Sequence, residues 1–300
     1  MLEVASVTLH EPAELPAASA SARAGTLALP PRPTAGQPRS PLAHPIAFCA
    51  KTLDIAEWEV RKIRHDPTDL ITRAVQPLLW LLVFGEVFTR VHAIQTGNKP
   101  YLDFMAPGIL AQSVLFISIF YGIAVIWERD LGVIHKFLAS PTPRAALVLG
   151  KALSAGLRAL PQAIVIYLLA LVLGVRMNWN PLALLGVFVF IILGAACFST
   201  FSLVIACLLK SRERVMGIGQ VLTMPLFFAS NAIYPITIMP VWLQVIARGN
   251  PLSYTVDALR TLMLANQPSV LGLGTDLAVM LAVTVALVLL GAKLYPNIVQ

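Results

Sequence analysis

Long runs without a charged residue constrain the fold of this chain more than any other feature. Residues 104–127 separate Asp103 from Glu128, and residues 177–209 separate Arg176 from Lys210, with no Asp, Glu, Lys or Arg in either run. As a helix, the shorter run is roughly 36 Å long, enough to cross the roughly 30 Å hydrocarbon core of a bilayer with some tilt. With 57% hydrophobic and 12% charged residues, the chain is too apolar for a soluble domain. We therefore predict an all-α, polytopic membrane protein.

The apolar runs divide the chain into three parts. Residues 1–44 are rich in Ala, Pro and Ser and predict a disordered tail. Residues 45–68 alternate apolar and charged positions at a helical period and predict an amphipathic helix in the inner membrane interface. Residues 69–295 predict a transmembrane domain with six spans. The spans are expected at about 70–88, 104–127, 145–174, within 177–209 from near Pro181, 215–230 and 271–290.

The distribution of Lys and Arg predicts the orientation. With the N-terminus inside, thirteen basic residues flank the spans on the inner side and five on the outer side. The positive-inside rule then places both termini in the cytoplasm, with the chain in the cell (inner) membrane. The outer five are Arg90, Lys99, Arg176, Arg248 and Arg260.

Residues 231–260, before the last span, cannot form a single span. Pro235, Pro240 and Pro251 divide them into pieces too short to cross a membrane, although each piece is apolar. Irregular backbone at membrane depth is tolerated where protein or water covers it. We therefore predict short re-entrant helices in the outer leaflet, with Trp242 and Tyr254 as interfacial anchors.

The polar segment between the second and third predicted spans has the pattern of a surface helix. Leu131, Ile134, Phe137 and Leu138 fall at helical spacing among basic residues, and a Pro-Thr-Pro sequence follows them. A rigid, basic, half-apolar element at the membrane surface is suited to binding another protein. We predict that residues 128–144 couple the membrane domain to a partner.

Other classes of function lack their motifs. Basic residues are dispersed over loops and span ends, so no basic domain is available for nucleic acid. Three cysteines do not form a disulfide framework, and five dispersed histidines lack metal-ligand spacing. Gly150-Lys151 resembles the end of a P-loop, but Ala145 and Ala152 replace the required Gly and Ser or Thr. We expect no enzyme activity and no bound cofactor or metal in this chain by itself.

Two separated stretches resemble ABC-2 type transporter permeases. The first contains Glu128-Arg129-Asp130-Leu131-Gly132 and continues to Gly150-Lys151; the second runs from Asn231 to Arg260 and contains Asn250-Pro251-Leu252-Ser253-Tyr254. Within that family the chain resembles the daunorubicin-resistance permeases, which have a basic N-terminal helix and an Asp-Pro just before span one, here Asp66-Pro67. The resemblance covers about residues 45–295.

The resemblance implies a six-helix permease that pairs with a second permease, identical or homologous, and with two copies of a cytoplasmic ATPase. ATP and Mg would be used by that ATPase. The segment around Leu131 to Leu138 would be the helix that docks on it, and Glu128 matches the family's acidic residue at the inner end of span two; an ordinary helix-end charge is the alternative. The residues assigned to coupling are Glu128, Arg129, Leu131, Gly132, Lys136, Phe137, Leu138, Pro141, Pro143 and Arg144.

Two further groups of polar and anchoring residues are candidates for transport. Arg158 and Gln162 lie inside an apolar run and predict a pathway or gate, although an ion pair with a neighbouring helix would also explain Arg158. The expected function is outward transport of an amphipathic drug, lipid or glycolipid; polysaccharide export within the same family and a secondary transporter are alternatives. The outer candidates are Tyr234, Pro235, Trp242, Asn250, Pro251 and Tyr254.

Overall fold

The structure is a computed structural model that describes residues 75–91, 100–132, 134, 143–209, 211–265 and 267–298. The predicted tail at 1–44 and the predicted interfacial helix at 45–68 lie outside these residues. The described part is helical, with one isolated antiparallel bridge between Met177 and Leu264 and no β-strand. The elements are η1 Trp80–Phe84, α3 Gly85–Val91, α4 Tyr101–Ile123, α5 Val125–Asp130, α7 Arg144–Val172, α8 Pro181–Leu208, α9 Arg212–Phe228, η2 Ile236–Ile238, α10 Val241–Gly249, α11 Pro251–Met263, α12 Leu273–Leu294 and η3 Tyr295–Ile298.

Four helical stretches of the described residues are long and apolar enough to cross a membrane. They are Tyr101–Asp130, Arg144–Val172, Pro181–Leu208 and Leu273–Leu294. Each coincides with a predicted span, which confirms the all-α membrane-type architecture. The predicted fifth span corresponds to α9, whose 17 residues give a helix of only about 25 Å. The predicted first span is described only from residue 75, so six spans stays a prediction.

Proline and asparagine define where several helices begin. Pro100 precedes α4 and Pro143 precedes α7. Each proline has an extended backbone conformation, so the helix begins at the residue after it. Helix α8 starts at Pro181, and the side-chain oxygen of Asn180 accepts a hydrogen bond from the N–H of Leu182 at 3.0 Å. This Asn-Pro start satisfies a free N–H of the first turn, and the same pair opens α11.

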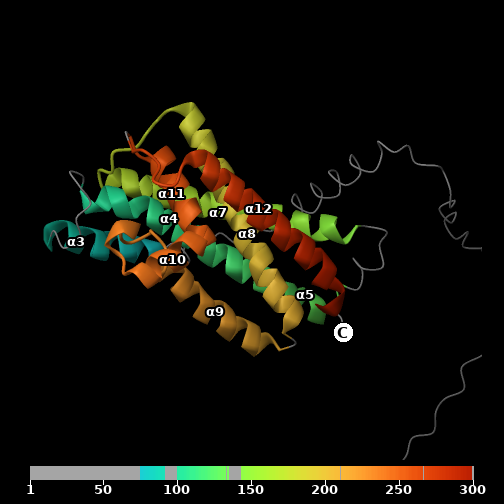
Figure 1. The fold of residues 1–300 in the computed structure, drawn as a ribbon. Helices are drawn as coiled ribbons and strands as arrows, with labels where there is room; N and C mark the ends of the chain where they lie inside the picture. The colour runs from blue at the N-terminus through green and yellow to red at the C-terminus, as the bar shows by residue number, and fades with distance from the viewer. Residues whose placement is uncertain are drawn as a thin grey trace, which may run out of the picture. The chain divides into compact units, whose positions relative to one another are not determined.

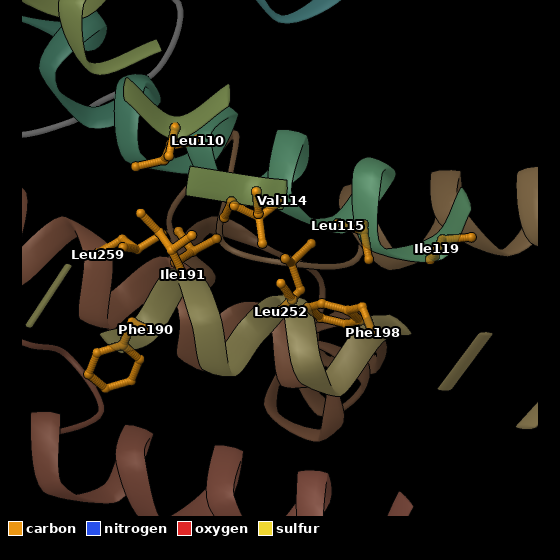
Figure 2. Close-up of a cluster of buried hydrophobic side chains, with 14 of the residues drawn as sticks. Leu110, Val114, Leu115, Ile119, Phe190, Ile191, Phe198, Leu252 and Leu259 are labelled. Carbon is orange, nitrogen blue, oxygen red and sulfur yellow. The ribbon is translucent and has the colours of Figure 1, made fainter. Parts of the chain in front are cut away.

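Helices α4 and α8 form the centre of the helical bundle. Helix α8 packs against α4, α7, α11 and α12, and α4 also contacts α7, α9 and α11 (Figure 1). Of the 18 most apolar consecutive residues, 83% are buried in the stretch Tyr101–Asp130, but only 17% in Leu273–Leu294. Figure 2 shows Val114 of α4 facing Ile191 of α8, with Leu252 of α11 beside them. Helix α12 therefore lies at the periphery, with most of its apolar surface uncovered within this chain.

Two glycines allow α4 to approach its neighbours at backbone distance. A Cβ atom at Gly108 would lie 2.2 Å from the carbonyl oxygen of Ala232, and one at Gly122 would lie 2.3 Å from that of Ser199 in α8. Beside Gly122, the hydroxyl of Ser202 donates a hydrogen bond to the carbonyl of Ile119 at 2.7 Å. Small residues at such contacts are the usual basis of helix packing in lipid, where no hydrophobic effect drives helices together.

The region before α12 is broken where the prolines predict. Pro235 precedes η2, Pro240 precedes α10, and Pro251 begins α11. The three helices have 3, 9 and 13 residues, so none can cross a bilayer. Their position in the outer leaflet stays a prediction.

Candidate functional site

An ion pair joins α5 to α7 at the end of the bundle that we call the Glu128 end. Glu128 lies in α5, which continues the line of α4, and its carboxylate pairs with the ammonium of Lys151 in α7. The side chains are 16% and 14% exposed, respectively. A partly buried pair of this kind fixes two helices relative to each other, because leaving either charge alone would be costly.

Beside this ion pair, a second cation of α7 lies against an aromatic ring of α4. The ring centroid of Tyr121 lies 5.9 Å from the Lys151 ammonium and 5.0 Å from the Arg158 guanidinium. Cations within about 6 Å of an aromatic face are attracted to it. A narrow cleft beside this group is lined by Tyr121 and Lys151 together with Ser199 and Thr200 of α8. Arg158, predicted for a pathway or gate, therefore belongs to the surroundings of the Glu128–Lys151 pair.

Gln162, the second predicted pathway residue, lies farther along α7 and is 1% exposed. Its amide nitrogen and oxygen both lack a hydrogen-bond partner in the described structure. Gln112 of α4 is 2% exposed and its amide is equally unpaired. Buried amides are normally paired, so each is a candidate for a ligand or a water. Gln112 was missed in the sequence, although it lies in an apolar run just as Gln162 does and carried the same signal.

A second link at the Glu128 end connects α5 to α9. Asp130 pairs with Arg212, the first residue of α9, and also accepts a hydrogen bond from Arg129 at 2.9 Å. Helix α5 ends directly after Asp130: Leu131 is 77% exposed, and Gly132 has a φ of +71°, a left-handed conformation that glycine adopts freely. An exposed leucine at a helix end is available for contact with a partner.

The rest of the predicted coupling segment is described only in part. Lys136, Phe137, Leu138 and Pro141 lie outside the described residues. Pro143 precedes α7, and the exposed Arg144 is its first residue. The structure therefore places the two ends of the segment, and the helix predicted between them stays a prediction.

The predicted outer residues lie at the opposite end of the bundle, which we call the Arg260 end. Asn250 accepts a hydrogen bond from the N–H of Leu252 at 3.0 Å and donates to the carbonyls of Leu226 at 2.7 Å and Ala229 at 3.1 Å. One side chain thus starts α11 and holds the C-terminal end of α9 against it.

The aromatic residues of the same region bind backbone carbonyls or are exposed. The hydroxyl of Tyr234, which precedes Pro235, donates to the carbonyl of Phe228, and that of Tyr254 donates to Arg248. Trp242 is 66% exposed, as an interfacial anchor would be. These bonds give Tyr234 and Tyr254 a structural role that the sequence pattern did not indicate.

Arg260 is buried at this end, although its sequence position predicts an outer flanking charge. Its guanidinium donates to the carbonyls of Asn231 at 2.8 Å and Phe104 at 3.3 Å, and lies 3.7 Å from the Phe104 ring centroid. Burial lowers the pKa of Arg260 to about 10, while the carboxylate of Asp257 acts to raise it. Arg260 therefore stays cationic at neutral pH and joins α11 to α4 and to the turn at Asn231.

Comparison with known proteins identifies the family. Residues 55–264 match the model of the ABC-2 type transporter family. The putative transport permease ycf38 of Cyanophora paradoxa is 32% identical over 203 residues, or 67% of this chain and 70% of that protein. The daunorubicin resistance ABC transporter permease protein DrrB1 of Streptomyces coeruleorubidus is 30% identical over 200 residues, again 67% and 70%. The probable multidrug ABC transporter permease YbhR of Escherichia coli is 28% identical over 171 residues, 56% of this chain and 45% of that protein. The chain described here belongs to the ABC-2 type transporter family.

Proposed function

We propose that this chain is the membrane-spanning subunit of an ATP-driven exporter that moves an amphipathic drug, lipid or glycolipid outward. ATP, with Mg, is bound and hydrolysed by a separate cytoplasmic ATPase present in two copies. A second permease, identical or homologous, completes the membrane part. The observation that carries the proposal is the family match over residues 55–264. The relatives named for daunorubicin resistance and multidrug transport favour an amphipathic substrate.

The Glu128 end supplies a route by which a partner could move the membrane helices. Glu128 and Asp130 lie on one short helix, and each pairs with a cation of a different helix, α7 or α9. The segment that follows leads to Phe137 and Leu138, the apolar candidates for contact with the ATPase. In this proposal, displacement of the segment by the ATPase moves α5, and the two ion pairs pass that motion to α7 and α9.

We propose that the chain lies in the inner membrane of the cell and crosses it six times. Both termini are then in the cytoplasm, and the re-entrant helices lie on the outer side. The charge asymmetry of the sequence supports this orientation. Reporter domains inserted at Lys99 and Gly249 are expected to be external, and those at Ala139 and Arg212 cytoplasmic. An external reporter at Ala139 would contradict the orientation.

Reconstitution tests the division of labour between the subunits. The purified chain in liposomes should not hydrolyse ATP above background, whereas addition of its cognate ATPase with ATP and Mg should drive daunorubicin, as a fluorescent probe, across the bilayer. ATP turnover by the isolated chain, or daunorubicin transport that does not depend on the ATPase, would contradict the proposal.

The docking segment is tested by replacing both Phe137 and Leu138 with Ser. Insertion should be normal because the segment lies outside the spans, while export and co-purification of the ATPase should be lost. Central apolar anchors of interfaces contribute roughly 2–4 kcal/mol each to binding. Phe137→Leu, which keeps an apolar side chain, is the matched control and should retain both properties. Normal export by the double Ser variant would remove the docking role.

A further inference from the structure

The carboxylate of Asp257 anchors the turn between α11 and α12. Its oxygens accept hydrogen bonds from the hydroxyl of Ser269 at 2.6 Å and from the backbone N–H groups of Val270 at 3.0 Å and Leu271 at 2.9 Å. Asp257 is 1% exposed. Several donors thus converge on one carboxylate, and Asp257 is the anchor of residues 267–272, which we call the strap.

A second buried carboxyl group lies against the same serine. Asp276, in the first turn of α12, is 0% exposed, and its Oδ2 lies 3.5 Å from the Ser269 oxygen. Its Oδ1 has no hydrogen-bond partner in the described structure. Because both carboxyl groups contact one hydroxyl, their nearest oxygens are no more than about 6 Å apart.

The hydrogen-bonding capacity of the Ser269 hydroxyl decides whether Asp276 carries a proton. A hydroxyl has one hydrogen and two lone pairs. The hydrogen of Ser269 goes to the nearer carboxylate, that of Asp257, and one lone pair accepts the N–H of Gly272 at 2.7 Å. The contact with Asp276 is then favourable only when Asp276 carries a proton and donates it to the remaining lone pair.

Among the residues that the structure describes, the surrounding charges do not neutralise a second carboxylate. Arg260, one turn along α11, interacts with Asp257 and binds the carbonyls of Asn231 and Phe104. Arg176, whose carbonyl accepts the N–H of Ala265, has an exposed side chain. Helix α8, also packed against α11 and α12, carries no charged residue. Repulsion between two buried carboxylates at this separation opposes the attraction of an ionised Asp276 to the start of α12.

We propose that Asp257, Ser269 and Asp276 form a proton-binding site. One proton, taken from water, resides on Asp276 and completes a chain in which Asp276 donates to Ser269 and Ser269 donates to the Asp257 carboxylate. A metal ion is a poor occupant, because the N–H groups of Val270 and Leu271 already point at the Asp257 oxygens. Loss of the proton leaves two buried negative charges, and the strap separates from α11.

Amide hydrogen exchange measures this directly, since the N–H groups of Val270 and Leu271 bind Asp257. In the full chain in lipid nanodiscs between pH 5 and 9, corrected for intrinsic exchange, their protection should fall as the pH rises, by up to about tenfold for each pH unit while opening releases the proton. The N–H of Asn178, which donates to the carbonyl of Met263 at 2.8 Å, is the internal control and should stay protected. Protection of Val270 and Leu271 that does not change over this range would overturn the proposal.

Two variants separate the proton from the fold. Asp276→Asn carries permanent N–H donors in place of the proton, so the strap should stay protected at every pH. Asp257→Asn removes the anionic acceptor and should leave the strap unprotected at every pH. A pH dependence in Asp276→Asn equal to that of the wild type would refute the site.

A spectroscopic measurement on the wild type does not depend on whether the variants fold. The infrared spectrum should contain the carbonyl stretch of a protonated carboxylic acid at pH 6 and lose it as the pH is raised. Absence of that band at low pH would also overturn the proposal.

Discussion

The two ends of the helical bundle are held together by different chemistry. At the Glu128 end, ion pairs between side chains connect α5 to α7 and to α9, and the side chains retain some contact with solvent. At the Arg260 end, buried side chains bind backbone carbonyl and N–H groups, as Asn250 and Arg260 do. Ion pairs between flexible side chains tolerate displacement, whereas a buried hydrogen bond to backbone is lost when its partner moves. We expect substitutions at the Arg260 end to reduce stability and substitutions at the Glu128 end to reduce transport.

The largest loss of stability is expected for Asn250→Ala. It leaves the carbonyls of Leu226 and Ala229 and the N–H of Leu252 without their partner. Each buried group left unpaired costs roughly 1–3 kcal/mol, so a loss of about 3 kcal/mol in unfolding free energy is expected. Denaturation in detergent measures it. Asn250→Asp, the matched control, keeps the acceptor and loses the donors, so its unfolding free energy should lie between those of the wild type and Asn250→Ala. Equal stability of all three proteins would contradict the structural role of Asn250 at the Arg260 end.

The next largest effect is expected for Gly108→Ala, also near the Arg260 end. The new Cβ would lie 2.2 Å from the carbonyl oxygen of Ala232, a backbone atom that cannot yield without moving the turn. Overpacking of this kind costs about 1–3 kcal/mol. Gly217→Ala in α9 has nothing within 4 Å of its new Cβ and should be neutral or stabilising by up to about 1 kcal/mol. If the two variants had the same melting temperature, the close contact between Gly108 and the Ala232 backbone would not contribute to stability.

At the Glu128 end, Lys151→Met should lower stability by about 1–2 kcal/mol, less than a fully buried pair would, because both side chains keep some solvent contact. Export should fall much more than this loss explains. The exchanged pair Glu128→Lys with Lys151→Glu should restore part of the export rate. A double variant as inactive as either single one would show that the charges act separately.

The smallest effect on stability is expected for Arg212→Ala, which removes the exposed pair with Asp130. Pairs of this kind contribute little, so the melting temperature should not change measurably. Export should nevertheless fall if α9 receives its motion through this pair. Arg214→Ala, an exposed position two residues along the same helix, is the control and should be normal in both measurements. Equal export rates for the two variants would exclude Asp130–Arg212 from transmission.

Helix positions could be predicted from the sequence because they depend on local chemistry. The charge-free run beginning near Pro181 becomes α8 at Pro181–Leu208, and the run predicted at 145–174 becomes α7 at Arg144–Val172. Prolines at 235, 240 and 251 broke the following region where expected. Charge and proline content act within a few residues, so no tertiary information was needed.

The side-chain partners could not be predicted in the same way. Glu128 and Lys151 are 23 residues apart in sequence, and Asp130 and Arg212 are 82 apart, so only the packing of the helices brings each pair together. Arg260 was expected among the outer flanking charges and is instead buried, because its partners are carbonyl groups that have no sequence signature. Gln112 could have been singled out as Gln162 was, since both lie in apolar runs, but the lack of a partner for each amide is recognisable only once its surroundings are known.

The close contact between α4 and α8 has a mechanical consequence. Gly122 against the backbone of Ser199, and the Ser202 hydrogen bond to Ile119, fix the two helices to each other at one level, while the rest of α8 offers an apolar, uncharged surface. Contacts of that kind are non-directional and allow one helix to tilt against the other. Ile119 is roughly 14 Å along the helix from Glu128 and roughly 27 Å from Tyr101. Helix α4 thus has the geometry of a lever with unequal arms: a displacement of Glu128 relative to α8 would be approximately doubled at Tyr101, where the contacts of Gly108 with Ala232 and of Phe104 with Arg260 oppose it.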